Sequence, residues 1–127
     1  MTEILLDSDV IIGWLRGYHP FAELIPELVS KANLAWTPVS VAEIYAGVRR
    51  SEESRIDNLF LVLETVPLSA EIGKKAGNYL HAYSKSHGVE LGDALIAATA
   101  YVHGLRLWTL NKKHYPMKDL EFYALNK

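Results

Sequence analysis

A short apolar run near the start of the chain is interrupted by three polar side chains. The run covers residues 4–12, and its polar members are Asp7, Ser8 and Asp9. A run this apolar is buried in a folded protein. A buried carboxylate is costly unless it is hydrogen-bonded, paired with a cation or bound to a metal. The chain must therefore fold in a way that compensates these two acids.

Two interpretations of this run are open. In the plain one, residues 4–6 form a buried strand and residues 10–15 a helix, with Asp7 or Ser8 as the helix cap. In the sharper one, Asp7 stands at the carboxyl end of the first strand, where open α/β sheets bind their ligands. The rest of the chain decides between them.

The length and composition predict one domain, covering residues 1–127. A chain of 127 residues is large enough for one core and too short for two. Half of its residues are hydrophobic, which excludes a disordered chain. It contains no cysteine, so disulfides and thiolate metal sites are excluded and any metal must be held by oxygen or imidazole.

The net charge of −2 gives no overall attraction to nucleic acid, so any contact with phosphate must be local. No apolar run approaches the roughly 20 residues that span a bilayer. Met1-Thr2-Glu3 lacks the basic start of a signal peptide. We therefore expect a soluble, cytoplasmic protein with no membrane association.

Strand and helix signals alternate along the chain, which predicts an α/β fold with a mostly parallel central sheet and helices on both faces. Four to five strands are expected, at residues 4–6, 34–37, 65–67, 105–109 and 120–123. Helices are expected at residues 10–15, 21–31, 40–49, 56–63, 69–87 and 91–103. The last of these is apolar nearly all round and is followed by Gly104, so it is predicted to be buried at the centre.

Three acids occupy places where polar side chains are not expected. Asp7 ends an apolar strand, Glu43 lies one turn into a helix, and Asp93 lies at the head of the most apolar helix. Strand ends and helix starts share one edge of a parallel sheet, so the three acids should converge. Each acid also has a simpler explanation, since Ser40 and Glu43 match a capping box and Asp93 suits the helix dipole.

Further polar groups follow the strand expected at residues 105–109. Thr109 and Asn111 would stand at the same sheet edge, where their neutral oxygens could complete a site for a hard cation. Four of the five histidines show no spacing typical of metal ligands: His19, His81, His87 and His103.

Four sequence blocks, at residues 5–12, 39–47, 91–97 and 109–111, resemble the signature blocks of PIN-domain nucleases, specifically VapC-type toxins of toxin–antitoxin pairs. The blocks appear in the family's order and span most of the chain. The resemblance implies a single PIN domain and an endoribonuclease dependent on Mg²⁺ or Mn²⁺. It also implies a homodimer that is inhibited by a cognate VapB-type antitoxin.

Carried over residue by residue, the resemblance makes Asp7, Glu43 and Asp93 the catalytic, metal-binding acids. Asn111 stands 18 residues after Asp93, where the family often has a fourth acid. Asparagine adds no charge, so the number of bound cations, one or two, stays open. Ser8 and Thr109 resemble the family's supporting polar groups.

Asp9 stands where many relatives carry asparagine, and we interpret it as a helix-start residue. With Asp7 assigned to the metal, helix capping passes to Ser8 and Asp9. Replacing Asp7 is expected to remove activity, whereas replacing Asp9 is expected mainly to cost stability.

Local cations near the proposed edge are candidates to hold an RNA backbone: Arg16, Arg49, Arg50, Lys112 and Lys113. The two pairs that closely follow site blocks, at residues 49–50 and 112–113, are favoured. The alternative is a solvated charged rim.

Several aromatic side chains have two interpretations. Trp14, Trp36 and Tyr45 could stack on bases, but a place in the core or an interface is favoured. Trp14, Tyr18 and Phe21 could line a groove for an antitoxin segment or a second subunit. Such a segment would also present a basic side chain to the acids in place of metal.

No activated protein nucleophile is apparent, so the expected reaction is hydrolysis by a water that a divalent cation activates. Two alternatives remain at this point, a catalytically silent PIN-fold binding module and a structure-selective DNA nuclease. The reading frame immediately upstream is informative, because a toxin should be preceded by a small protein with a DNA-binding start and an amphipathic tail.

Overall fold

A central sheet of four parallel strands organises residues 3–124, which are the residues that the computed structural model describes. The strands are β1 (Glu3–Leu6), β2 (Asn33–Trp36), β3 (Glu64–Thr65) and β4 (Arg106–Trp108), in the spatial order β3-β2-β1-β4. Leu5 of β1 pairs with Ala35 on one side and Leu107 on the other. Met1 and Thr2, where no signal-peptide start is expected, lie outside the described residues.

Alternate strand residues face two separate hydrophobic layers. Leu5, Ala35 and Leu107 belong to one buried cluster, whereas Ile4, Leu6 and Trp36 belong to the other. Because successive side chains of a strand point to opposite faces, strands this apolar need cover on both. The predicted α/β class, with helices on both faces of a parallel sheet, is confirmed.

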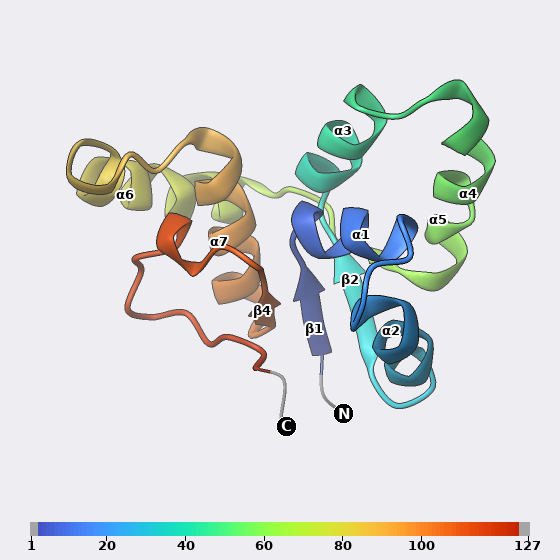
Figure 1. Ribbon diagram of the computed structural model, residues 1–127. Coiled ribbons are helices and arrows are strands. Elements are labelled where there is room, and N and C mark those ends of the chain that lie inside the picture. Colours follow the sequence, from blue (N-terminus) through green and yellow to red (C-terminus); the bar gives the residue numbers. More distant parts are fainter. Residues whose placement is uncertain (1–2, 125–127) are drawn as a thin grey trace.

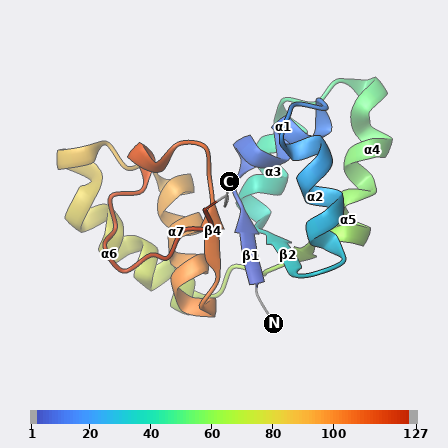
Figure 2. The same ribbon diagram turned by 60° about the horizontal axis from the view of Figure 1, so that its bottom comes forward.

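Two groups of helices supply this cover (Figure 1). The long helices α6 (Ala70–His87) and α7 (Leu91–His103) pack on one face. The other face carries the remaining helices, α1 (Ser8–Leu15), α2 (Phe21–Val29), α3 (Pro38–Ala46), α4 (Glu53–Asp57) and α5 (Leu59–Val62). Figure 2 shows the sheet between the two groups. Short 3-10 turns η1 (Arg50–Glu52) and η2 (Lys112–His114) complete the elements.

The two long helices begin and end where the sequence predicts. The Ser69 hydroxyl accepts a hydrogen bond from the Ile72 amide at 3.2 Å and caps α6. Gly104 ends α7 in the left-handed conformation, with φ of 64°, which a side chain would strain. The six residues Ala94 and Ile96–Ala100 of α7 are buried, as expected for the central helix. No helix among residues 3–124 is long and apolar enough to cross a membrane.

Two predicted elements differ from the structure. The single helix expected at residues 56–63 is two short ones, α4 and α5, that meet at Asn58, a residue type that favours turns over helix interiors. The strand expected at residues 120–123 is a single bridge between Phe122 and Leu107. The hydrogen bonds of this bridge join Leu107 to Glu121 and Tyr123, and the Tyr123 ring packs on Trp108.

An ion pair anchors the segment that follows η2. Asp119 accepts hydrogen bonds from Lys75 at 2.8 Å and from the Tyr79 hydroxyl at 2.7 Å, both on α6. Burial alone would raise the pKa of Asp119, but these two hydrogen bonds outweigh it and lower the pKa. The ionised carboxylate therefore stabilises the folded state.

We expect Asp119→Asn to lower the free energy of unfolding at pH 7 by about 0.5–1 kcal/mol, since the pair is partly exposed. A lowered folded-state pKa gives stability that is present above the unfolded pKa of about 4 and lost as the pH falls through the folded pKa. The difference between the variant and the wild type should therefore shrink below about pH 4 in urea titrations. Glu121→Gln, an exposed acid in the same segment, is the control and should have no such effect.

Candidate active site

Asp7 links the first strand, the first helix and the last strand. Its amide donates to the Trp108 carbonyl at 2.9 Å, which continues the pairing of β1 with β4. Its backbone is extended and its Oδ1 accepts from the Ser8 amide at 2.8 Å, so Asp7 occupies the N-cap position of α1. The prediction that capping passes to Ser8 and Asp9 is therefore wrong, because both residues already lie inside the helix.

The other carboxylate oxygen of Asp7 is held by two hydroxyl groups. Oδ2 accepts from Thr109 Oγ1 at 2.9 Å and from the Tyr115 hydroxyl at 2.8 Å. Burial and the charge of Asp7 raise the pKa of Tyr115, so its hydroxyl stays protonated and donates. A carboxylate has about four lone-pair positions. Three are used here, and a position on Oδ1 is left for a ligand.

Asp9 ties the start of α1 to the segment after β4. Its Oδ2 accepts from the Leu110 amide at 3.1 Å and lies 3.4 Å from Thr109 Oγ1. Its Oδ1 is buried and has no hydrogen-bond partner among residues 3–124. Burial, followed by repulsion from Asp7, raises the pKa of Asp9 to about 6. Asp7 and Asp9 together thus form an acid cluster that concentrates negative charge.

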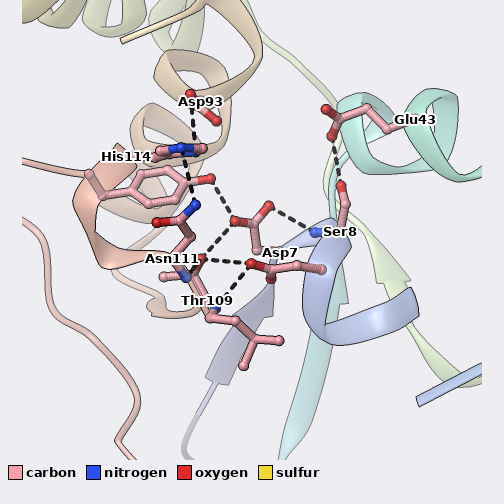
Figure 3. Close-up of polar contacts among 10 residues, drawn as sticks. Asp7, Ser8, Glu43, Asp93, Thr109, Asn111 and His114 are labelled. Carbon is pink, nitrogen blue, oxygen red and sulfur yellow. Dashed lines mark hydrogen bonds and ion pairs between the residues drawn. The ribbon is translucent and has the colours of Figure 1, made fainter. Parts of the chain in front are cut away.

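Glu43 reaches toward α1 from the exposed side of α3 (Figure 3). Its Oε1 accepts from Ser8 Oγ at 2.6 Å, and Ser8 Oγ lies 3.1 Å from Ser40 Oγ. The capping-box explanation fails, because α3 begins at Pro38 and Thr37 Oγ1 caps it by accepting from the Ser40 amide. Ser8 therefore orients Glu43, and the residue that caps α3 is Thr37.

Asp93 faces the cluster from the first turn of α7, next to His114 and Asn111 (Figure 3). His114 Nδ1 lies 3.9 Å from Asp93 Oδ2, and the Asn111 side-chain nitrogen lies 3.1 Å from His114 Nε2. Burial raises the pKa of Asp93, an effect that His114 opposes and the charge of Asp7 strengthens. Asn111 also donates its backbone amide to Thr109 Oγ1 at 3.1 Å.

The carboxylate oxygens at this sheet edge are suitable ligands for a hard divalent cation that keeps most of its bound water. Within residues 3–124 no three histidine, aspartate or glutamate side chains close around one point as a preformed cage. Mg²⁺, however, is usually bound by one or two carboxylates and several waters. Asp7 with its free position and Asp93 opposite it are such carboxylates, and the orphaned Oδ1 of Asp9 adds negative charge beside them.

Comparison with known proteins identifies the family. The model of the PIN domain matches residues 4–120. The chain belongs to the PIN-domain family. Two relatives from Mycobacterium tuberculosis place it with the VapC group. Ribonuclease VapC10 is 39% identical over 115 residues, which cover 90% of this chain and 86% of the relative. Ribonuclease VapC19 is 33% identical, over 89% of this chain and 92% of the relative.

Solved structures share the PIN fold. A chain in the crystal structure of VapBC2 from Rickettsia felis, bound to a promoter DNA fragment, superposes with a TM-score of 0.82 and 19% identity. The match covers 98% of this chain and 100% of that one. A chain of DNA-bound VapBC from Salmonella typhimurium gives a TM-score of 0.80 and 17% identity, over 97% and 98% of the two chains.

The PIN domain brings the predicted polar site residues to one edge of the sheet. Thr109 contacts both Asp7 and Asp9, Ser8 bonds to Glu43, and Asp93 joins Asn111 through His114. The roles of the acids as metal ligands stay predictions. The basic pairs at residues 49–50 and 112–113 are exposed.

Sequence reasoning missed two residues of the site, His114 and Tyr115. Both come from the turn after Asn111, and Tyr115 is buried with its hydroxyl on Asp7. Both follow the predicted site residue Asn111 closely in the sequence, and this proximity could have indicated them. Nothing in the local pattern, however, indicates the inward direction of the tyrosine.

Thr109 offers a test of the hydrogen bonds that hold the site together. We expect Thr109→Val, which keeps the shape and removes the hydroxyl, to lower the free energy of unfolding by about 1–3 kcal/mol. The loss has two causes, a donor removed from Asp7 and an acceptor removed from the Asn111 amide. Thr109→Ser keeps the hydroxyl and should lose at most about 1 kcal/mol. Equal losses in urea titrations of the two variants would contradict this account.

Proposed function

We propose that this PIN domain is a metal-dependent endoribonuclease that acts as the toxin of a toxin–antitoxin pair. The observation that carries the proposal is the meeting of buried Asp7 with Asp9 and Asp93 at the carboxyl edge of the sheet. The two VapC relatives, which are named ribonucleases, support the choice of RNA as substrate. A cytoplasmic location would place the enzyme with its RNA, and a chain without cysteine suits that reducing compartment.

Asp7 and Asp93 would hold Mg²⁺ or Mn²⁺, with Glu43 and the carbonyl oxygen of Asn111 in support. When bound, the cation supplies positive charge against the scissile phosphate and acidifies a water for in-line attack. The chain's own residues prepare the site. Thr109 fixes one oxygen of Asp7, and Ser8 fixes Glu43. Orientation of this kind lowers the entropy that is lost when substrate and water are positioned.

Exposed cations near the acids would hold the RNA backbone. Arg49 and Arg50 follow α3, which carries Glu43, and Lys112 and Lys113 form η2 directly after Asn111. Arg16 lines a small cleft of about 90 Å³ together with Glu43. These contacts would neutralise phosphate charge, and they would not read the base sequence.

Replacing the acids is the direct test of this function. We expect Asp7→Asn and Asp93→Asn each to reduce cleavage of single-stranded RNA in Mg²⁺ buffer at least 100-fold, because each removes a charged ligand of the cation. Cleavage is followed on an end-labelled RNA with protein freed of contaminating nucleases. Glu71→Gln, an exposed acid in the first turn of α6, is the matched control and should cleave like the wild type.

A test of metal binding distinguishes the proposed enzyme from the alternative, a catalytically silent binding module. Millimolar Mg²⁺ or Mn²⁺ should raise the melting temperature of the wild type, since a ligand that binds only the folded state stabilises it. The shift should disappear in Asp7→Asn. Full cleavage by a folded double variant of Asp7 and Asp93 would overturn the mechanism, and a wild type without a shift would favour the silent module.

A cleft between α1 and the α4–α5 pair is our candidate for the antitoxin site. Trp14, Leu59 and Val62 line it, and its volume is about 220 Å³. Of the other predicted groove residues, Tyr18 is exposed, whereas Phe21 is buried against Gly13 and Trp108. Tyr45 bonds to Asp57 of α4. Trp36 lies in the core and bonds to Thr65, which leaves it no part in base stacking.

The surface next to this cleft is apolar. Leu61 is 87% exposed and Phe60 is 47% exposed, and exposed apolar side chains that cluster are typical of interaction sites. We assign the cleft to an amphipathic antitoxin segment, and Leu61 with Phe60 to the second subunit of a homodimer.

The cleft is tested with the small protein encoded immediately upstream, which we expect to be the antitoxin. Val62→Glu places a charge in the cleft and should weaken the complex at least 10-fold in titration calorimetry, while RNA cleavage by the free variant is retained. Leu68→Glu is the control, because Leu68 is about as exposed as Val62 and is not among the residues that line the cleft. Equal affinity of both variants would place the antitoxin elsewhere.

A further inference from the structure

Tyr115 is a buried residue with its polar end in the acid cluster. Only 3% of its surface is exposed, and its ring belongs to the hydrophobic cluster that α7 forms with the sheet. Its hydroxyl lies 2.8 Å from Asp7 Oδ2. A buried phenol of this kind is fixed by packing over its whole ring, so its hydroxyl has one accessible position.

The backbone on both sides of Tyr115 is also fixed. Before it, the η2 turn closes with a hydrogen bond from the Tyr115 amide to the Lys112 carbonyl at 3.0 Å. After it, Met117 is buried and Asp119 is paired with Lys75 on α6. The hydroxyl is thus aimed at Asp7 by a segment that is anchored at both ends.

The three hydrogen bonds to Asp7 are unequally divided between its two oxygens. Oδ2 accepts from both Thr109 and Tyr115, which uses its two lone pairs, whereas Oδ1 accepts only from the Ser8 amide. Only Oδ1 of the carboxylate therefore has a lone pair free to bind a cation, and the hydrogen bonds to Oδ2 fix the direction in which Oδ1 points.

We propose that Tyr115 is a positioning residue that holds Asp7 with Oδ1 directed to the divalent cation. This inference rests on the proposed function, in which Asp7 is a metal ligand. Groups that hydrogen-bond to a metal ligand fix its orientation, and their loss typically weakens metal binding 10- to 100-fold. Without the phenol, Thr109 alone would hold Oδ2, and the carboxylate could turn about its Cβ–Cγ bond.

The chain contains a matched control for this hydrogen bond. Tyr79 is also buried, with 4% of its surface exposed, and its hydroxyl donates to the Asp119 carboxylate at 2.7 Å, outside the acid cluster. Tyr115→Phe and Tyr79→Phe each keep the ring and remove one buried hydroxyl from a carboxylate. Lys75 still holds Asp119 in Tyr79→Phe, so the effects of the two variants on folding should be similar and only Tyr115→Phe should change the affinity for metal.

The experiment is a titration of the metal-free protein with Mn²⁺, in which the free ion is measured by electron paramagnetic resonance without RNA. We expect the dissociation constant to rise about 10-fold in Tyr115→Phe and to be unchanged in Tyr79→Phe. An unchanged constant in Tyr115→Phe, with tight binding by the wild type that Asp7→Asn abolishes, overturns this inference and leaves the proposed function standing. Failure of the wild type to bind Mn²⁺ overturns both.

Discussion

The buried carboxylate of Asp7 is the group on which the rest of the site depends. Two of its hydrogen bonds come from hydroxyls more than a hundred residues away along the chain, 102 positions for Thr109 and 108 for Tyr115. An acid that is 8% exposed is tolerated only with such partners. The site therefore forms only when the first and last strands lie next to each other, and folding of the sheet and assembly of the site are one event.

The strand order explains why the acids gather at this point. The chain builds the sheet outward from β1 through β2 to β3, and then returns to place β4 on the other side of β1. The carboxyl ends of β1 and β4 thus flank the place where the direction of winding reverses, and open α/β sheets bind ligands at such a reversal. Asp7 directly follows β1 and Thr109 directly follows β4, so this topology alone brings them together. The N-termini of α1 and α7 carry Asp9 and Asp93 to the same edge.

Most of the sheet follows from repeating patterns in the sequence, and most of the site follows from where its polar residues stand relative to the predicted strands and helices. Apolar runs of strand length, helical spacing and helix-ending glycines are local signals, and they predict the four strands and the two long helices. Capping at Asp7 is one of two interpretations of the sequence, but the local pattern does not decide among three adjacent polar residues, because the choice depends on contacts that Thr109 and Glu43 make from distant segments. Tyr115 is missed for a related reason. It directly follows a 3-10 turn and enters the core from an irregular segment, which the ion pair of Asp119 with Lys75 ties to α6.

The replacement of the expected fourth acid by Asn111 is consistent with the charge already present. The charge of Asp7 repels both Asp9 and Asp93, and burial together with this repulsion raises the pKa of Asp9 to about 6. A further carboxylate at position 111 would add to that repulsion in the absence of a second cation. The amide instead faces His114 with its nitrogen, and its carbonyl oxygen can still accept a hydrogen bond or bind a cation. Asparagine at this position therefore keeps an oxygen that can bind a cation at the sheet edge, and it adds no negative charge that burial would destabilise.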